Sequence, residues 1–157
     1  MTTGQVTIRR AATADEDKVL ELVERLVEFG PPAWRNAEQM VIVDKRRIAA
    51  ALQAQGEDPK VMVATLGGEV AGFVHVHSLK DHYRDAPHGH VSDIVVAPAH
   101  EGHGVGRLLL DAARAWATEQ GFQWLTISVF EDNRRAAEMY ERAGFGRDVL
   151  RLVQPLR

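Results

Sequence analysis

A glycine-rich turn is the stretch of this sequence with the most specific chemistry. Residues 94–110, IVVAPAHEGHGVGRLLL, combine an apolar strand pattern, a turn with Gly102, Gly104 and Gly106, and an amphipathic helical pattern. Glycines this close together let backbone N–H groups converge without interference from Cβ atoms. The start of the following helix adds unpaired N–H donors and the positive end of a dipole. The turn therefore predicts a phosphate or pyrophosphate site; the alternative is a tight strand–helix connection.

Two common phosphate-binding motifs do not fit this turn. The dinucleotide fingerprint needs G-x-G-x-x-G, and here the third glycine comes too early. The nucleotide-triphosphate loop needs G-x-x-x-x-G-K-[ST], and the chain has no Gly-Lys pair. Both classes are excluded.

A second polar pattern follows one helix and one strand later. Asn133 is placed to cap a helix that ends near Gly144, and Tyr140 lies about two turns after Asn133 on the same face. A phenol with a reference pKa of about 10 is protonated at neutral pH and can donate a proton. Periodicity alone also fits a packing role for Tyr140 beside Ala136 and Ala143.

Together the two segments resemble the GNAT superfamily of acyl-CoA-dependent N-acyltransferases. The first is V-x-P-x-x-x-G-x-G-x-G from Val96 to Gly106, and the second is N-x-x-A-x-x-x-Y-x-x-x-G-F from Asn133 to Phe145. The resemblance covers nearly the whole chain. It implies a single domain over residues 1–157 with the α/β GNAT fold, a mixed central sheet flanked by helices. It also implies transfer of an acetyl group from acetyl-CoA to a primary amine by direct attack in a ternary complex.

The resemblance further implies roles for individual residues. The glycine turn would hold the pyrophosphate, the strand before it would hydrogen-bond pantetheine, and Tyr140 would protonate the departing thiolate. The implied cofactor-binding residues are Ile94, Val95, Val96, Gly102, His103, Gly104, Val105, Gly106, Arg107 and Asn133. No covalent acyl-enzyme is expected, because the chain has no Cys and no G-x-S-x-G turn. A non-catalytic acyl-CoA sensor of the same fold is the alternative.

One position departs from the family's pattern. Where the pyrophosphate loop usually carries Arg or Gln, this chain has Glu101. A carboxylate near a pyrophosphate is repulsive by on the order of 1 kcal/mol where water screens the pair well. Either His100, His103 or Arg107 offsets this charge, or the side chain of Glu101 points outward.

The group that removes the acceptor's proton has several candidates. Asp93 lies just before the expected cofactor strand, where a buried carboxylate could act as the general base. The alternatives are a structural role for Asp93 and the use of ordered water. The histidines could also take part, line the acceptor pocket, bind a metal, or be partly exposed polar residues. All of them fall within one segment: His75, His77, His82, His88, His90, His100 and His103.

Composition excludes several other classes of protein. A chain of 157 residues fits one core, and its net charge of −3 disfavours a generic nucleic-acid binder. No apolar run approaches the roughly 18 to 20 residues that span a bilayer. Without Cys or an H-x-x-x-H spacing, no metal is expected. The N-terminal sequence lacks a signal-peptide pattern, so we expect a cytoplasmic protein whose partner is a small-molecule or peptide amine, with no nucleic-acid or membrane partner.

Hydrophobic periodicity predicts the elements that must position these residues. The predicted order is βααβββαβαβ, typical of an α/β fold with a mixed sheet. Thr13 and Glu16 form a capping-box pattern, and Gly67-Gly68 marks a hairpin. The last strand could pair across a homodimer. The predicted strands are 5–9, 61–66, 69–77, 90–97, 124–130 and 149–153, and the helices are 13–29, 37–55, 105–120 and 133–144. The third helix is expected to bury Val105, Leu108, Leu109, Ala112 and Trp116.

Overall fold

The computed structural model describes residues 4–29 and 31–157, and its centre is a mixed sheet of five strands. The strands lie side by side in chain order, the first four antiparallel and the fifth parallel to the fourth. They are β1 (Thr7–Arg10), β2 (Lys60–Leu66), β3 (Glu69–Lys80), β4 (Pro87–Val96) and β5 (Leu125–Ile127). The predicted α/β class with a mixed sheet is confirmed.

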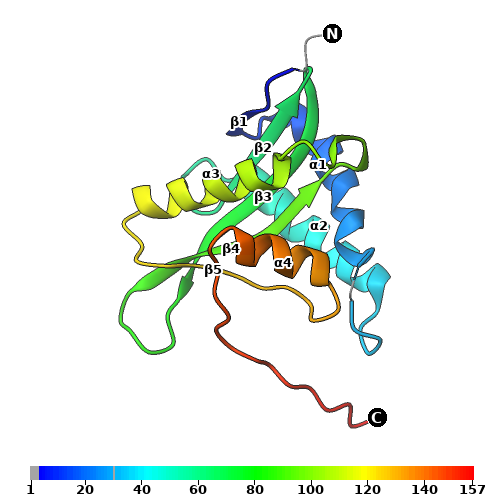
Figure 1. Cartoon of the computed structure of the whole chain (residues 1–157), viewed down its shortest axis with the longest axis vertical. Coiled ribbons are helices and arrows are strands. Elements are labelled where there is room, and N and C mark those ends of the chain that lie inside the picture. Colours follow the sequence, from blue (N-terminus) through cyan, green and yellow to red (C-terminus); the bar gives the residue numbers. More distant parts are fainter. Residues whose placement is uncertain (1–3, 30) are drawn as a thin grey trace.

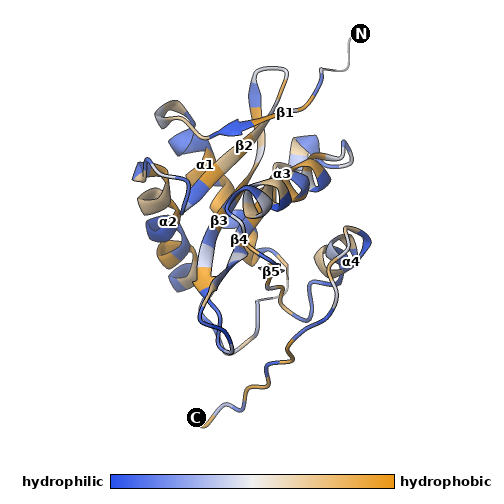
Figure 2. Ribbon diagram, turned by 90° about the vertical axis from the view of Figure 1, so that its left-hand side faces the viewer, coloured by the Kyte–Doolittle hydropathy of each residue, from blue (hydrophilic) through white to orange (hydrophobic). Residues whose placement is uncertain are grey.

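Helices cover both faces of this sheet (Figures 1 and 2). On one face lie α1 (Glu16–Val23) and α2 (Ala37–Gln53), and on the other lie α3 (Val105–Glu119) and, beyond β5, α4 (Arg134–Arg142). The sheet therefore separates two apolar clusters. The cluster under α3 includes Val74, Val91, Leu109 and Trp116; the cluster under α1 and α2 includes Val23, Ile48, Phe73 and Val95.

The pairing of β4 with β5 is short, and this controls the shape of the site. Only Gly89–Val91 pair with Leu125–Ile127. Beyond that point the register between β3 and β4 shifts by one residue, so that Ser92 is an extra residue between the pairs made by Val91 and Asp93. The predicted strand over 124–130 is therefore shorter than expected, because residues 128–130 have no neighbouring strand to pair with.

The expectation of a last strand over 149–153 is wrong. In the described part of the chain, residues after α4 form no helix or strand, and the apolar side chains Val149, Leu150, Leu152 and Val153 are exposed. In Figure 1 this tail runs away from the body of the molecule. A β-branched pattern needs a paired neighbour to form a strand, and none lies beside this segment. Because residues 149–153 form no strand, the structure gives no support to the expected pairing of such a strand across a homodimer.

The two ends of α4 follow their predicted signals. The Asn133 side chain caps the helix by accepting a hydrogen bond from the backbone N–H of Ala136. At the other end Gly144 has a φ of 104°, and the N–H of Phe145 donates to the carbonyl of Tyr140 at 3.0 Å. This is the geometry of a glycine-terminated helix with its apolar contact.

Two details of the other helices differ from the expectations. Thr13 does not cap α1: a 3-10 turn (Thr13–Asp15) comes first, and the Asp15 carboxylate accepts from the N–H of Ala12 while Arg9 holds it. In α3, Leu108 is 38% exposed, because the helix turns the stripe that contains Leu109 and Ala113 toward the sheet.

Gly72 on β3 provides a test of how tightly β3 and β4 approach. A Cβ added at Gly72 would lie 2.5 Å from the carbonyl oxygen of Val95, which is backbone and cannot swing aside. We expect Gly72→Ala to lower the free energy of unfolding by about 1–3 kcal/mol, as overpacking does. Urea unfolding measures this. The matched control is Gly56→Ala, whose Cβ meets nothing within 4 Å; equal stability of the two variants would contradict the described packing.

Candidate functional site

The turn before α3 forms a cradle of backbone N–H groups. Gly102 and Gly104 have φ values of 80° and 76°, and a Cβ added to either would meet nothing within 4 Å. Gly104 occupies the N-cap of α3 and has no side chain to cap it. Since the first helical hydrogen bond is Leu108 N–H to Gly104 carbonyl, the N–H groups of the preceding first-turn residues face outward unpaired. An anion fits in front of such a cradle.

The third glycine of the turn has a different role, which is to allow close packing. A Cβ on Gly106 would lie 3.0 Å from the sulfur of Met139 and 3.6 Å from a methyl group of Val96. Gly106 therefore lets α4 and β4 approach the start of α3. This brings α4, through Met139, close to the start of α3.

The outer edge of β4 has free backbone groups just before the turn. The N–H of Ala97 donates to the carbonyl of Ala71 at 2.7 Å. Because hydrogen-bonding direction alternates along an antiparallel strand, Val95 also directs its backbone groups toward β3. Ile94 and Val96 direct theirs away from β3, to the side that β5 has left. Of the three predicted pantetheine-binding residues, Ile94 has both backbone groups accessible and Val96 has its N–H accessible, because Arg25 engages the Val96 carbonyl. Val95 packs its side chain in the core.

Glu101 is held by an arginine that the sequence did not point to. Nη2 of Arg25 lies 2.9 Å from Oε1 of Glu101, with the side chains 15% and 35% exposed, and Arg135 lies 3.9 Å from the other carboxylate oxygen. Arg25 also donates to the carbonyl of Val96 and to Glu28. Burial alone would lower the pKa of Arg25, but its bonds to Glu101 and Glu28 outweigh this and raise it. The departure at Glu101 is thus electrically compensated from the end of the first helical segment.

Tyr140 is buried, with 8% of its surface exposed, and its ring packs edge-on against Phe145. Burial raises the pKa of Tyr140 to about 12, so the phenol stays protonated over the whole neutral range. Among the described residues no hydrogen bond engages its hydroxyl. The group remains available to a ligand.

Asp93 lies at the closed end of the β4 edge and is buried beside a histidine. Its Oδ2 lies 2.9 Å from Nδ1 of His75, the residue opposite it on β3. Asp44 on α2 faces this pair, and burial, followed by the charge of Asp93, raises the pKa of Asp44. Arg47, also on α2, donates to the hydroxyl of Ser92 at 3.1 Å.

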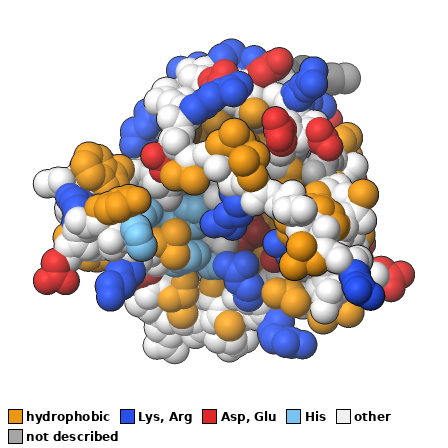
Figure 3. Space-filling model, turned by 90° about the horizontal axis from the view of Figure 1, so that it is seen from below, with side chains coloured by type: hydrophobic (Ala, Val, Ile, Leu, Met, Phe, Trp, Pro, Cys, Tyr) orange, Lys and Arg blue, Asp and Glu red, His pale blue; other side chains and the backbone are white. Residues whose placement is uncertain are grey.

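The histidine row continues from this pair across the sheet. The ring of His77 lies 5.5 Å from that of His75, and the ring of His90 lies 5.5 Å from that of His77. Nδ1 of His90 contacts the hydroxyl of Thr126 on β5 at 2.8 Å. Burial, together with the neighbouring histidines, lowers the pKa of His90 to about 4. Figure 3 shows histidine side chains gathered on the lower face beside basic side chains.

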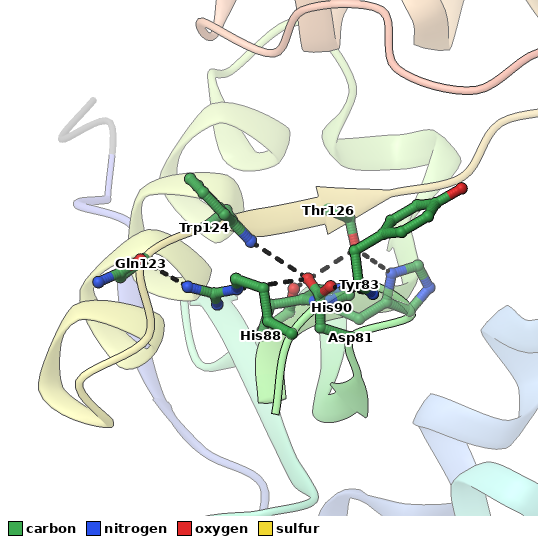
Figure 4. A network of polar contacts seen from close by, with 9 residues as sticks. Asp81, Tyr83, His88, His90, Gln123, Trp124 and Thr126 are labelled. Atoms are coloured by element: carbon green, nitrogen blue, oxygen red, sulfur yellow. Dashed lines mark hydrogen bonds and ion pairs between the residues drawn. The ribbon is translucent and has the colours of Figure 1, made fainter. Parts of the chain in front are cut away.

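The loop between β3 and β4 is fastened to β5 by a separate polar network (Figure 4). Asp81 accepts from the N–H of Tyr83 at 2.8 Å and from the indole N–H of Trp124 at 3.5 Å. Arg84 donates to Gln123 at 2.6 Å and stacks on the ring of Trp124. These contacts hold β5 against β4 where the two strands are still paired. Over residues 4–29 and 31–157 no three side chains are grouped as metal ligands.

Parallel strands that separate beside a backbone N–H cradle can hold an extended ligand that carries an anionic group. The sequence places the chain in one family. The sequence profile of the Acetyltransferase (GNAT) family matches residues 21–145. The chain belongs to this family and is an acetyl-CoA-dependent N-acetyltransferase.

Known proteins match the sequence of this chain over different lengths. The chain is 29% identical to the uncharacterized N-acetyltransferase YhfO of Bacillus subtilis, over 90% of each protein. It is 37% identical to streptothricin acetyltransferase of Streptomyces lavendulae over 95 residues, and this match covers 59% of this chain and 48% of that protein. It is 35% identical to mycothiol acetyltransferase of Catenulispora acidiphila over 95 residues, and this match covers 57% of this chain and 29% of that protein.

Solved structures share the fold. The aminoglycoside N-acetyltransferase AAC(6')-Iy in complex with CoA has a TM-score of 0.76 at 18% identity, covering 99% of this chain and 97% of that one. Glucosamine-6-phosphate N-acetyltransferase from Arabidopsis thaliana has a TM-score of 0.70 at 19% identity, covering 98% and 99%. Within the described residues, no helix is long and apolar enough to cross a membrane.

The Arg25–Glu101 pair leads to a prediction about cofactor affinity. Glu101→Gln removes a negative charge beside the cradle and frees Arg25 and Arg135 from it, so we expect CoA to bind several-fold more tightly, on the order of 1 kcal/mol. The gain should shrink at high salt. Calorimetric titration at two ionic strengths measures both effects. Glu28→Gln is the matched control, because it removes the other carboxylate of Arg25 outside the turn; an equal gain in both variants would contradict a role of the turn itself.

The lowered pKa of His90 predicts a loss of stability in acid. Between about pH 6.5 and about pH 4 the unfolded chain protonates His90 and the folded protein does not. Stability therefore falls as the pH drops through this window. We expect His90→Asn, which keeps a polar atom near Thr126, to flatten this fall in urea-unfolding midpoints. The exposed residue His82 provides the control: His82→Asn should follow the wild-type curve, and the idea fails if His90→Asn does so too.

Proposed function

We propose that this enzyme transfers the acetyl group of acetyl-CoA directly to an amine within a ternary complex. The observation that carries the proposal is the order of three features along β4 and the turn that follows it. Starting from the pyrophosphate end, these are the N–H cradle at residues 102–107, the open backbone edge at Val96 and Ile94, and the polar cluster at Asp93. A pyrophosphate, a pantetheine chain and an acceptor amine match these features in that order.

The donor substrate fits the cradle and the edge by their chemistry. Free N–H groups of the first turn of α3 suit phosphate oxygens, and the positive charge of Arg107 adds to the attraction. Arg25 and Arg135 offset the negative charge of Glu101. His103 and Val105 belong to the same turn and contribute backbone at the cradle. The amide groups of pantetheine suit the backbone of Ile94 and Val96 as a replacement for a strand partner. Asn133 remains the helix cap, and a contact with the donor is compatible with that role.

The acceptor amine would approach from the side of the strand gap that faces α2, at the end of the gap away from the cradle. Asp44 and Asp93 give this side two carboxylates, against one guanidinium from Arg47. This balance suits a cationic amine. The relatives named for streptothricin and aminoglycosides are consistent with basic acceptors, and aminoglycosides are therefore included among the acceptors to be tested.

Tyr140 assists the departure of the thiolate in this proposal. A phenol with a pKa of about 12 does not surrender its proton outright to a thiolate, whose conjugate acid has an ordinary pKa of about 8.5. A concerted relay avoids a free phenolate: the hydroxyl donates to the sulfur while it receives the proton that the amide nitrogen must lose. Tyr140 then donates one proton and receives another in the same step.

Ligand-dependent unfolding combined with thiol release tests the proposed function. We expect acetyl-CoA and CoA, but neither NAD nor zinc, to raise the unfolding temperature by several degrees, since saturation at about 100 times Kd adds about 2.7 kcal/mol. Thiol release is then followed with kanamycin, 1,4-diaminobutane, L-lysine and a dipeptide as acceptors. A shift with acetyl-CoA and no release with any amine would favour the acyl-CoA sensor instead.

Tyr140→Phe separates catalysis from packing at that residue. The ring and its contact with Phe145 remain, so we expect nearly unchanged stability and acetyl-CoA binding, with kcat lowered about 10- to 1,000-fold by loss of the hydroxyl. Steady-state kinetics with the best acceptor, beside a thermal-unfolding control, measures the split. An unchanged kcat would return Tyr140 to a packing role.

A further inference from the structure

A buried histidine–aspartate pair lies at the closed end of the gap between β4 and β5. His75 and Asp93 are opposite each other on β3 and β4, and their side chains are only 5% and 8% exposed. The pairing with β5 ends at Val91, and the open edge begins at Ile94. An extended chain that follows this edge from the cradle would therefore end beside the pair.

The hydrogen bond between the two side chains determines the tautomer of His75. An ionised carboxylate only accepts hydrogen bonds, so Nδ1 of His75 carries the hydrogen that points to Asp93. In the neutral ring Nε2 is then left with its lone pair. No hydrogen bond among the described residues engages Nε2 of His75. An imidazole held in this way by a carboxylate is arranged to take a proton.

The charged groups around the pair favour an approaching ammonium ion. Asp44 on α2 faces both His75 and Asp93, and the neighbouring Arg47 is turned to the hydroxyl of Ser92. On the sheet itself the next group is the ring of His77, whose Nδ1 is engaged by the carbonyl of Ser78. The pair is thus flanked by one further carboxylate, one imidazole and one guanidinium.

We infer that His75 is the general base of the acetyl transfer and that Asp93 is a positioning residue acting through it; this rests on the proposed function. Asp93 already accepts the hydrogen of His75 through Oδ2, and taking up a proton would remove the negative charge that strengthens this hydrogen bond. His90 is a poor candidate for the same task, since its Nδ1 contacts Thr126 and its surroundings keep it uncharged.

The protons balance as follows in the reaction. Nε2 of His75 takes one proton from the acceptor ammonium, and the neutral amine attacks the thioester carbonyl carbon. As the carbon–sulfur bond breaks, the nitrogen loses a second proton and the sulfur gains one through the hydroxyl of Tyr140. The imidazolium of His75 returns its proton to water. One ammonium and one thioester thus give one amide, one thiol and one free proton.

Two variants and two kinds of acceptor test this inference. We expect His75→Gln to lower kcat/KM for the best basic amine by about 10²- to 10⁴-fold at neutral pH, with the rising limb of the pH profile moved to higher pH. The loss should be smaller for O-methylhydroxylamine, whose nitrogen is already uncharged at neutral pH. Asp93→Asn should lower the rate as well, because an amide can donate to Nδ1 and leave the hydrogen on Nε2.

Three further measurements separate catalysis from structure. The acetyl-CoA shift in unfolding temperature should be the same in wild type, His75→Gln and the exposed control His82→Gln. Added imidazole should restore part of the activity of His75→Ala. The double variant His75→Gln/Asp93→Asn should be no slower than His75→Gln alone, as expected for one residue acting through another.

The outcomes distinguish the two proposals. If the wild-type enzyme releases thiol and His75→Gln keeps its rate and pH profile, the inference is overturned and the proposed function stands. If Asp93→Asn slows His75→Gln further, Asp93 acts independently and the positioning role is wrong. If the wild-type protein releases no thiol with any acceptor, the proposed function fails and the role of His75 fails with it.

Discussion

The separation of β4 from β5 after Val91 and Ile127 is the constraint on which the rest of the structure depends. Strands that stayed paired would satisfy each other's backbone groups and leave nothing for a ligand to bind. That pairing ends next to the extra residue Ser92, and beyond it both backbone groups of Ile94 and the N–H of Val96 are accessible, while Arg25 engages the carbonyl of Val96. The same separation also removes the partner of residues 128–130, so β5 is short and the chain is free to turn toward α4. The open edge of β4 and the short strand β5 thus both follow from the early end of the β4–β5 pairing.

At the wide end of this gap, backbone geometry and charge act together. The glycines provide the left-handed φ values that turn N–H groups outward, and the uncapped start of α3 supplies their dipole. Glu101 would oppose an anion there, but Arg25 and Arg135 compensate it. Arg25 also donates to the carbonyl of Val96, so one guanidinium connects the glycine-rich turn to the strand edge. The first helical segment thus contacts the glycine-rich turn although its own sequence carries no ligand-binding motif.

The closed end of the gap between β4 and β5 is lined by polar side chains, although the core next to it is apolar. His75 and Asp93 share a sheet face with Phe73 and Val95, and burying such groups is unfavourable unless they are paired. Their mutual hydrogen bond provides that pairing, and Asp44 adds a carboxylate whose raised pKa reflects its burial. Buried titratable groups of this kind are found together at functional sites. This cluster lies at the end of the open edge, where the proposed acetyl transfer needs a base.

The sequence by itself determined what depends on neighbouring residues: the Gly67-Gly68 hairpin, the Asn133 cap, the turn at Gly144 and the glycine-rich turn before α3. Each is a local backbone requirement that a residue type satisfies, so composition and spacing predict it. Only the tertiary structure decided which distant side chains meet. Arg25 and Glu101 are 76 positions apart, and His75 reaches Asp93 because of the β3–β4 register. It also left 149–153 without a partner, because strand formation depends on a neighbour that local pattern does not specify.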